Sequence, residues 1–155
     1  MGISKFTIDR AAPSYIEELA KNMRMKDRRE VTRQRPGMSL HEILSEAVDV
    51  SVFSRCGLVG GRVLAIWGLY VPHLLGDLGF PWAMTTDLMY ENKRLVMNLT
   101  KFYTAKMQRI TPTLVAHVDS NYLTALRWLS WAGFDTSESI EVNGYPFTLA
   151  IKEAA

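Results

Sequence analysis

The sequence predicts an α/β fold with a mixed sheet (α+β), in the order β-α-α-β-β-β-α-β-α-β-β, as a single domain over residues 1–155. Three observations support this prediction. β-rich runs follow one another in the middle of the chain, strands and helices alternate after them, and no low-complexity segment or linker divides the sequence. Helices in such an order must cover the faces of one mixed sheet.

Composition sets limits on function. Hydrophobic residues make up 48% and charged residues 22%, as in ordinary globular proteins, and a formal net charge of +2 is too small to indicate nucleic-acid binding. Cys56 is the only cysteine, which excludes an intramolecular disulfide and a cysteine-based zinc site. We expect no secretory leader, no transmembrane helix and no metal.

The N-terminal third begins with one strand and two helices. Alternating apolar and polar residues predict a strand at 6–10. Pro13 suits the first turn of a helix whose apolar residues recur at helical spacing as far as Met23. Ser39 and Glu42 form a capping box, which predicts the start of a second helix.

The remaining elements follow from β-rich runs, helical periodicity and turn residues. The segments "GLVGG" and "NGY" contain the glycines and asparagine that tight hairpin turns require. We predict strands at 50–56, 62–71, 81–90, 113–118, 134–142 and 145–151, and helices at 91–107 and 122–132.

A basic stretch follows the first helix. It contains six cations and two acids: Arg24, Lys26, Arg28, Arg29, Arg33 and Arg35, with Asp27 and Glu30. It has three interpretations, which are a solvated helix end, non-specific contact with DNA phosphates, and a docking site for an acidic partner. No aromatic residue is interleaved, which disfavours binding of single strands by this stretch.

Four tryptophans could be mistaken for a cofactor-binding set: Trp67, Trp82, Trp128 and Trp131. Aromatic residues at such spacing more often belong to the core, because each buries a large area. We expect Trp128 to be buried against the sheet. An exposed tryptophan would instead mark an interface.

The stretch 113–134 carries a resemblance to a known family. Asn121, Ala125 and the pair Gly133-Phe134 follow a valine-rich strand, in a pattern that resembles the GNAT superfamily of acyl-CoA N-acyltransferases. The resemblance covers nearly the whole chain. It implies a V-shaped opening in the sheet that holds the pantetheine of acyl-CoA.

A narrower resemblance rests on three segments, "KDRREV", "GFPWAMTTDLM" and "ALRWLSWAGF". They are similar to a GNAT-like family of short-tailed bacteriophages, in which some members are internal virion proteins and others are described as acetyltransferases.

The resemblance implies candidate site residues. Asp87 would be the general base, with His117 as a second candidate, and acetyl-CoA, if it binds, would contact Leu88, Lys93, Arg94 and Asn121. Structural roles compete with these assignments. Asp87 could be a turn or cap carboxylate, and His117 could be a strand histidine bonded to a neighbour. Asp119 could cap the following helix or serve as a base.

Two departures from the family pattern indicate a degenerate active site. Active members carry an Arg/Gln-x-x-Gly-x-Gly/Ala loop whose N–H groups bind the CoA pyrophosphate, whereas "DLMYENKRL" has no glycine and adds Glu91. Leu129 stands where the family often has a proton-donating tyrosine. We therefore expect no cofactor.

The sequence thus favours a non-enzymatic phage module of the virion interior or host cytoplasm. It would act in assembly or DNA ejection by binding virion or host proteins, with possible DNA contact through the basic stretch. The alternative is an active acetyl-CoA-dependent N-acetyltransferase that modifies a host amine. A third hypothesis is an early phage protein that inhibits a host enzyme.

Overall fold

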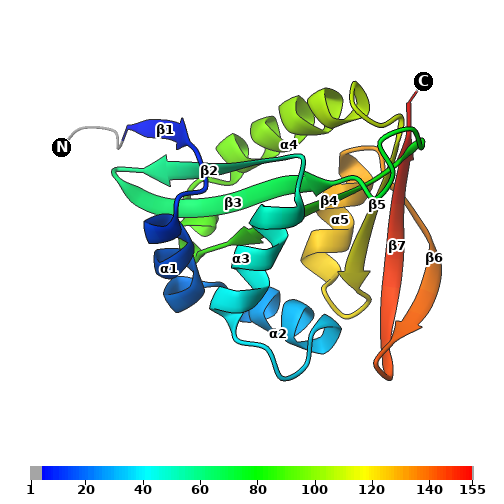
Figure 1. The fold of residues 1–155 in the computed structure, drawn as a ribbon, viewed down its shortest axis with the longest axis horizontal. Coiled ribbons are helices and arrows are strands. Elements are labelled where there is room, and N and C mark those ends of the chain that lie inside the picture. The colour runs from blue at the N-terminus through cyan, green and yellow to red at the C-terminus, as the bar shows by residue number, and fades with distance from the viewer. Residues whose placement is uncertain (1–4, 155) are drawn as a thin grey trace. The chain divides into compact units, whose positions relative to one another are not determined.

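A computed structural model describes residues 5–154 of the chain (Figure 1). This part contains a seven-stranded sheet of order β1-β2-β3-β4-β5-β7-β6 and five α-helices, so the predicted mixed α/β fold class is confirmed. The elements are β1 Phe6–Asp9, α1 Pro13–Asn22, α2 Met25–Gln34, α3 Leu40–Val50, β2 Phe53–Val59, β3 Arg62–Tyr70, β4 Leu78–Thr85, the 3-10 helix η1 Asp87–Glu91, α4 Lys93–Gln108, β5 Thr113–Asp119, α5 Leu123–Trp131, β6 Asp135–Val142 and β7 Tyr145–Glu153.

The chain forms two compact units. The first contains the described residues up to Gly68 together with Trp82–Lys93, and the second contains Leu69–Pro81 with the described residues from Arg94 onward. The single domain expected over residues 1–155 stays a prediction. Among the described residues, no helix combines the length and apolar character needed to cross a bilayer.

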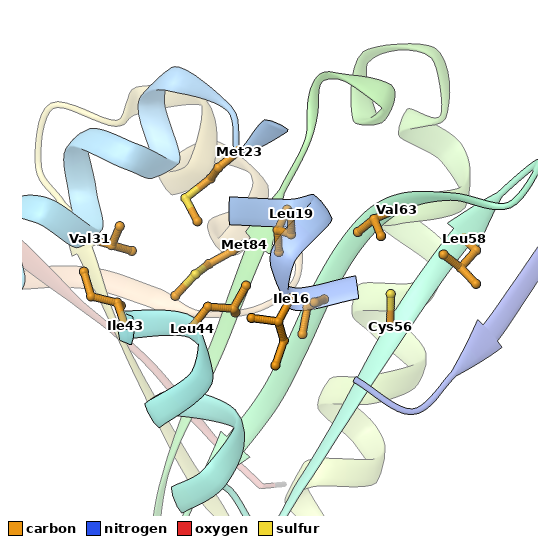
Figure 2. Packing of buried hydrophobic residues seen from close by; sticks show 11 residues of the cluster. Ile16, Leu19, Met23, Val31, Ile43, Leu44, Cys56, Leu58, Val63 and Met84 are labelled. Atoms are coloured by element: carbon orange, nitrogen blue, oxygen red, sulfur yellow. The ribbon is translucent and has the colours of Figure 1, made fainter. Parts of the chain in front are cut away.

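The core of the first unit lies where α1, α2 and α3 meet the strands (Figure 2). Leu19 of α1, Leu44 of α3 and Ile66 of β3 are fully buried there. Cys56 of β2 is buried in the same cluster, and burial raises the pKa of its thiol to about 12. The only cysteine is therefore a protonated core residue rather than a nucleophile.

The second unit is built on β5. Its first residues pair in parallel with β4 at Leu78↔Thr113 and Gly79↔Leu114, and its whole length pairs antiparallel with β7. β6 pairs antiparallel with β7. The apolar face of α4, which includes Val96, Tyr103 and Met107, is buried.

Both predicted hairpin turns are confirmed. Gly60 and Gly61 have φ values of 57° and 79°, and Asn143 and Gly144 have 51° and 84°. Two successive positive φ values match the twist of the flanking strands, and only glycine and asparagine adopt them at low cost.

The structure differs from the predicted elements at three places. It has one helix more than expected, because the basic stretch forms the separate helix α2. The strand predicted at 50–56 was wrong in its bounds, since α3 extends to Val50 and β2 spans Phe53–Val59. The strand predicted at 81–90 was wrong in its bounds, since β4 spans Leu78–Thr85 and the next five residues form η1. Tyr90 suits a strand by residue type, but the hydrogen bonds made by the N–H groups of Met89 and Asn92 close a 3-10 turn.

Candidate functional site at the end of β4

The end of β4 is held to β3 through Thr86. Its N–H donates to the carbonyl of Leu64 at 3.0 Å, and its hydroxyl donates to the carbonyl of Val63 at 2.8 Å. Thr86 is only 4% exposed. The backbone of β4 at this residue therefore faces β3.

The N–H and C=O groups of Thr85 point to the opposite edge of β4, because the backbone groups of successive strand residues point alternately to the two edges. Its carbonyl accepts the N–H of Arg24 at 2.8 Å. Its N–H and hydroxyl both donate to the Asp27 carboxylate, each at 2.7 Å. Met23 also forms an antiparallel bridge with Thr86. The α1–α2 connection thus pairs with β4 along this edge.

The side chain of Arg24 fixes η1 to the same connection. Arg24 is 4% exposed, donates a hydrogen bond to the Met89 sulfur, and lies over the Tyr90 ring at 4.9 Å from its centroid. An arginine from the predicted solvated stretch is therefore an interior residue. The expectation that Arg24 contacts a phosphate at the surface is wrong, since the side chain is buried against η1.

The backbone of η1 is closed by its own hydrogen bonds. The N–H of Met89 donates to the Thr86 carbonyl at 3.2 Å, and the N–H of Asn92 donates to the Met89 carbonyl at 3.0 Å. The Asn92 side chain donates to the Leu88 carbonyl at 2.8 Å. These two N–H groups are consequently engaged within the loop itself.

A pocket of about 380 Å³ opens beside η1 in the first unit. It is lined by Glu18, Asn22, Arg62, Val63, Thr86, Asp87, Leu88 and Glu91. Glu18 accepts the N–H of Val63 at 2.6 Å. Three carboxylates against one guanidinium give this pocket an anionic lining. Within residues 5–154, no group of three or more His, Cys, Asp or Glu side chains is arranged to hold a metal ion.

The predicted site residues fall in different places. Asp87 is exposed, begins η1 and lines the pocket, and Leu88 is half-buried beside it. Lys93 and Arg94 are exposed in the first turn of α4. The catalytic and cofactor roles assigned to these residues stay predictions.

His117 and Asn121 belong to the second unit. His117 is half-buried on β5, its ring centroid lies 5.6 Å from that of Phe80, and burial lowers its pKa. The imidazole is therefore neutral at pH 7. Asn121 is exposed, and its N–H donates to the side chain of Asp119 at 2.9 Å. Asp119 thus closes a turn before α5, and the expectation that it caps this helix is wrong, because the N-cap residue is Tyr122.

Sequence reasoning did not identify Arg24 and Asp27 as interior residues. Asp27 carried a usable signal, since it lies four residues before Val31 and thus on the same side of α2. Both residues are buried, whereas Lys26 and Arg29 on the same helix are exposed. The cations of the basic stretch therefore do not form one continuous exposed surface.

Two further cations of the basic stretch have structural partners. Arg28 donates through Nε to the Met23 carbonyl and through Nη2 to the Lys21 carbonyl, both at 2.7 Å. It thereby satisfies carbonyls at the end of α1. Arg35 forms an ion pair with Glu46 at 2.9 Å.

The tryptophans divide between core and surface. Trp67 is buried and Trp82 is half-buried, with its indole N–H donating to Ser51 at 2.8 Å. Trp128 is half-buried, so the burial predicted for it is found only in part. Trp131 is 46% exposed.

Comparisons with known proteins identify the fold. No family model and no curated protein sequence matches the chain. Among solved structures it is similar to the ribosomal-protein-S5-alanine acetyltransferase of Vibrio fischeri, with a TM-score of 0.69 and 12% identity over 99% of this chain and 95% of that one.

Two further structures show the same similarity. An acetyltransferase of the GNAT family from Streptococcus pneumoniae has a TM-score of 0.62 and 14% identity, covering 97% of this chain and 100% of that chain. RimL, a ribosomal L7/L12 α-N-protein acetyltransferase in complex with coenzyme A, has a TM-score of 0.69 and 9% identity. The match covers 99% of this chain and 97% of that chain. The chain therefore has the GNAT fold.

Proposed function

We propose that this chain uses the GNAT fold as a protein-binding module and does not use acetyl-CoA. The observation that carries this proposal is η1, which stands where the family's glycine-rich pyrophosphate loop is expected. An anion-binding loop needs N–H groups that point outward. Here the N–H groups of Met89 and Asn92 are bonded inside the loop.

The charges around η1 also disfavour a pyrophosphate. Glu18, Asp87 and Glu91 line the adjacent pocket, with Arg62 as its only cation. Like charges at close range repel, and among these three carboxylates the half-buried Glu18 is the least screened by water. The residues present therefore do not fit the phosphates of CoA.

The edge of β4 provides a second, independent argument. The family resemblance places an extended pantetheine in an opening of the sheet, and an extended ligand binds a strand through free backbone groups. At Thr85 these groups are bonded to Arg24 and Asp27 of the same chain. The α1–α2 connection thus takes hydrogen bonds that a ligand of this kind would use.

The virion role is the more specific form of this proposal. It is supported by the resemblance of "KDRREV", "GFPWAMTTDLM" and "ALRWLSWAGF" to the phage family. In that role the module would bind other virion or host proteins during assembly or DNA ejection. The exposed cations Lys26 and Arg29 of α2 are consistent with additional contact to packaged DNA.

The second candidate is an acetyl-CoA-dependent N-acetyltransferase. It is favoured by the similarity to enzymes of this fold, one of them solved with coenzyme A. Lys93 and Arg94, exposed in the first turn of α4, would be the cations nearest in sequence to η1 that could approach phosphates. Asp87 would then accept the proton of the amine.

Calorimetric titration of the full chain with acetyl-CoA, up to millimolar concentration, distinguishes the two. An active GNAT enzyme serves as the positive control. We expect no binding heat from this chain. A micromolar dissociation constant would refute the proposal and favour the enzyme.

A matched variant tests the role of η1 itself. Tyr90→Gly, Asn92→Gly and Glu91→Gln together remove two side chains and one negative charge from the loop. If η1 causes the loss of affinity, this variant binds acetyl-CoA more tightly than the parent chain. Unchanged binding would show that η1 is not the obstacle.

A further inference from the structure

The net charge of the chain conceals an uneven distribution. Between Arg94 and Phe134 the sequence has five cations and one acid, while the remainder has 13 cations and 15 acids. The single acid is Asp119, which is 1% exposed. The five cations are Arg94, Lys101, Lys106, Arg109 and Arg127, and all are exposed.

Four of these cations lie on or just after α4, and helical geometry places two of them on one side of the helix. Arg94 and Lys101 are seven residues apart, so they share a side of α4. Lys106 lies one turn after Phe102, and Arg109 follows just after the helix. The opposite side of α4 is buried. At 1.5 Å per residue, Arg94 and Lys106 are separated by roughly 18 Å along the helix axis.

Two exposed aromatic rings lie within this cationic surface. Phe102 is 61% exposed on α4, and Trp131 is 46% exposed at the end of α5. Lys101 Nζ lies 4.3 Å from the centroid of the Trp131 ring, which brings α5 beside α4. We call the surface formed by Arg94, Lys101, Phe102, Lys106, Arg109 and Trp131 the α4 surface.

We propose that the α4 surface binds single-stranded nucleic acid. The cations match a series of phosphates, and the exposed ring of Phe102 offers a face on which a base can stack, whereas Lys101 lies over one face of Trp131. An acidic protein would satisfy the charges but would leave Phe102 without a defined role. Helix α2 is less suited, because its basic stretch contains no aromatic residue and Arg28 caps α1.

This inference goes beyond the proposed function and does not depend on it, since acetyl-CoA and η1 take no part in it. The test is fluorescence anisotropy of a labelled oligothymidine of about 20 nucleotides with the full chain, at about 50 and 200 mM salt. The variant Lys101→Gln with Arg109→Gln removes two charges from the α4 surface. The control, Lys26→Gln with Arg29→Gln, removes two exposed charges from α2.

We expect the α4 variant to bind roughly tenfold more weakly, and the slope of log K against log salt to decrease by about 1.4. The α2 control should change affinity by less than about twofold. Phe102→Ala should weaken binding with an unchanged salt slope, since a ring stacks without releasing counterions.

Three results would overturn the proposal. The first is wild-type affinity in the α4 variant, or an equal loss in the α2 control. The second is equal affinity for a duplex of the same length together with no effect of Phe102→Ala. The third is competition by polyglutamate as effective as that by unlabelled oligothymidine, which would indicate an acidic protein partner.

Discussion

Asp27 shows how one buried carboxylate organises the end of β4. It is 7% exposed and accepts two hydrogen bonds from Thr85, through the N–H and the hydroxyl. Removing the acceptor leaves two buried donors without that partner, and each loss is worth roughly 1–3 kcal/mol. We expect Asp27→Ala to lower the free energy of unfolding by about 3 kcal/mol in urea titrations.

Two milder substitutions separate the contributions at this position. Thr85→Val removes only the hydroxyl bond and should cost about 1 kcal/mol. Asp27→Asn keeps one acceptor oxygen, so its loss in free energy of unfolding should lie between those of Thr85→Val and Asp27→Ala. A stability of Asp27→Ala equal to that of the parent chain would show that Asp27 does not hold β4.

At the scale of elements, the corner between α1 and α2 depends on Arg28. Its guanidinium donates to the carbonyls of Met23 and Lys21, which end α1 without intrahelical partners. We expect Arg28→Ala to destabilise the chain by about 1–2 kcal/mol in thermal or urea unfolding.

Arg29 is the matched control for this prediction, because it is the adjacent arginine and is exposed. Arg29→Ala should change the free energy of unfolding by less than about 0.5 kcal/mol. Equal effects of the two substitutions would assign the loss to charge or helix propensity rather than to capping.

Elements with local signals could be predicted from the sequence. Ser39 accepts the N–H of Glu42 at 3.1 Å, as the capping box predicted, and both hairpins turn at the predicted glycines. Such features depend on residues within four positions of one another. Helix α2 lacked a comparable signal, because only Asp27 and Val31 of its ten residues are buried.

The candidate site could be predicted only in part, because some of its contacts join residues that are far apart in the sequence. The position of Asp87 after β4 followed from the order of elements. The burial of Arg24 did not, because its partners Met89 and Tyr90 lie more than 60 residues further along the chain. A sequence pattern within one helix cannot report a contact of that range.

At the scale of the whole molecule, the pocket that contains Asp87 and the cationic α4 surface belong to different units of the chain. The anionic pocket beside η1 belongs to the first unit, and the α4 surface to the second. The net charge of +2 therefore does not describe either surface. Binding experiments need to test each surface with its own variants, because a change in total charge affects both.

The global stability should depend on pH through His117. Burial lowers the pKa of this imidazole, whereas in the unfolded chain it protonates near about 6.5. Well above this unfolded-state pKa both states are neutral, and His117 contributes nothing to the pH dependence. As the pH falls below 6.5, the unfolded state binds the proton first, so the free energy of unfolding decreases.

His117→Gln removes this proton uptake, so its free energy of unfolding should vary less between pH 7 and about 5.5 than that of the parent chain. Urea titrations at a series of pH values measure the difference. His73 is exposed, and His73→Gln is therefore the matched control. Parallel pH profiles for the parent chain and His117→Gln would mean that the imidazole takes up its proton equally in both states, and that its packing against Phe80 does not keep it neutral.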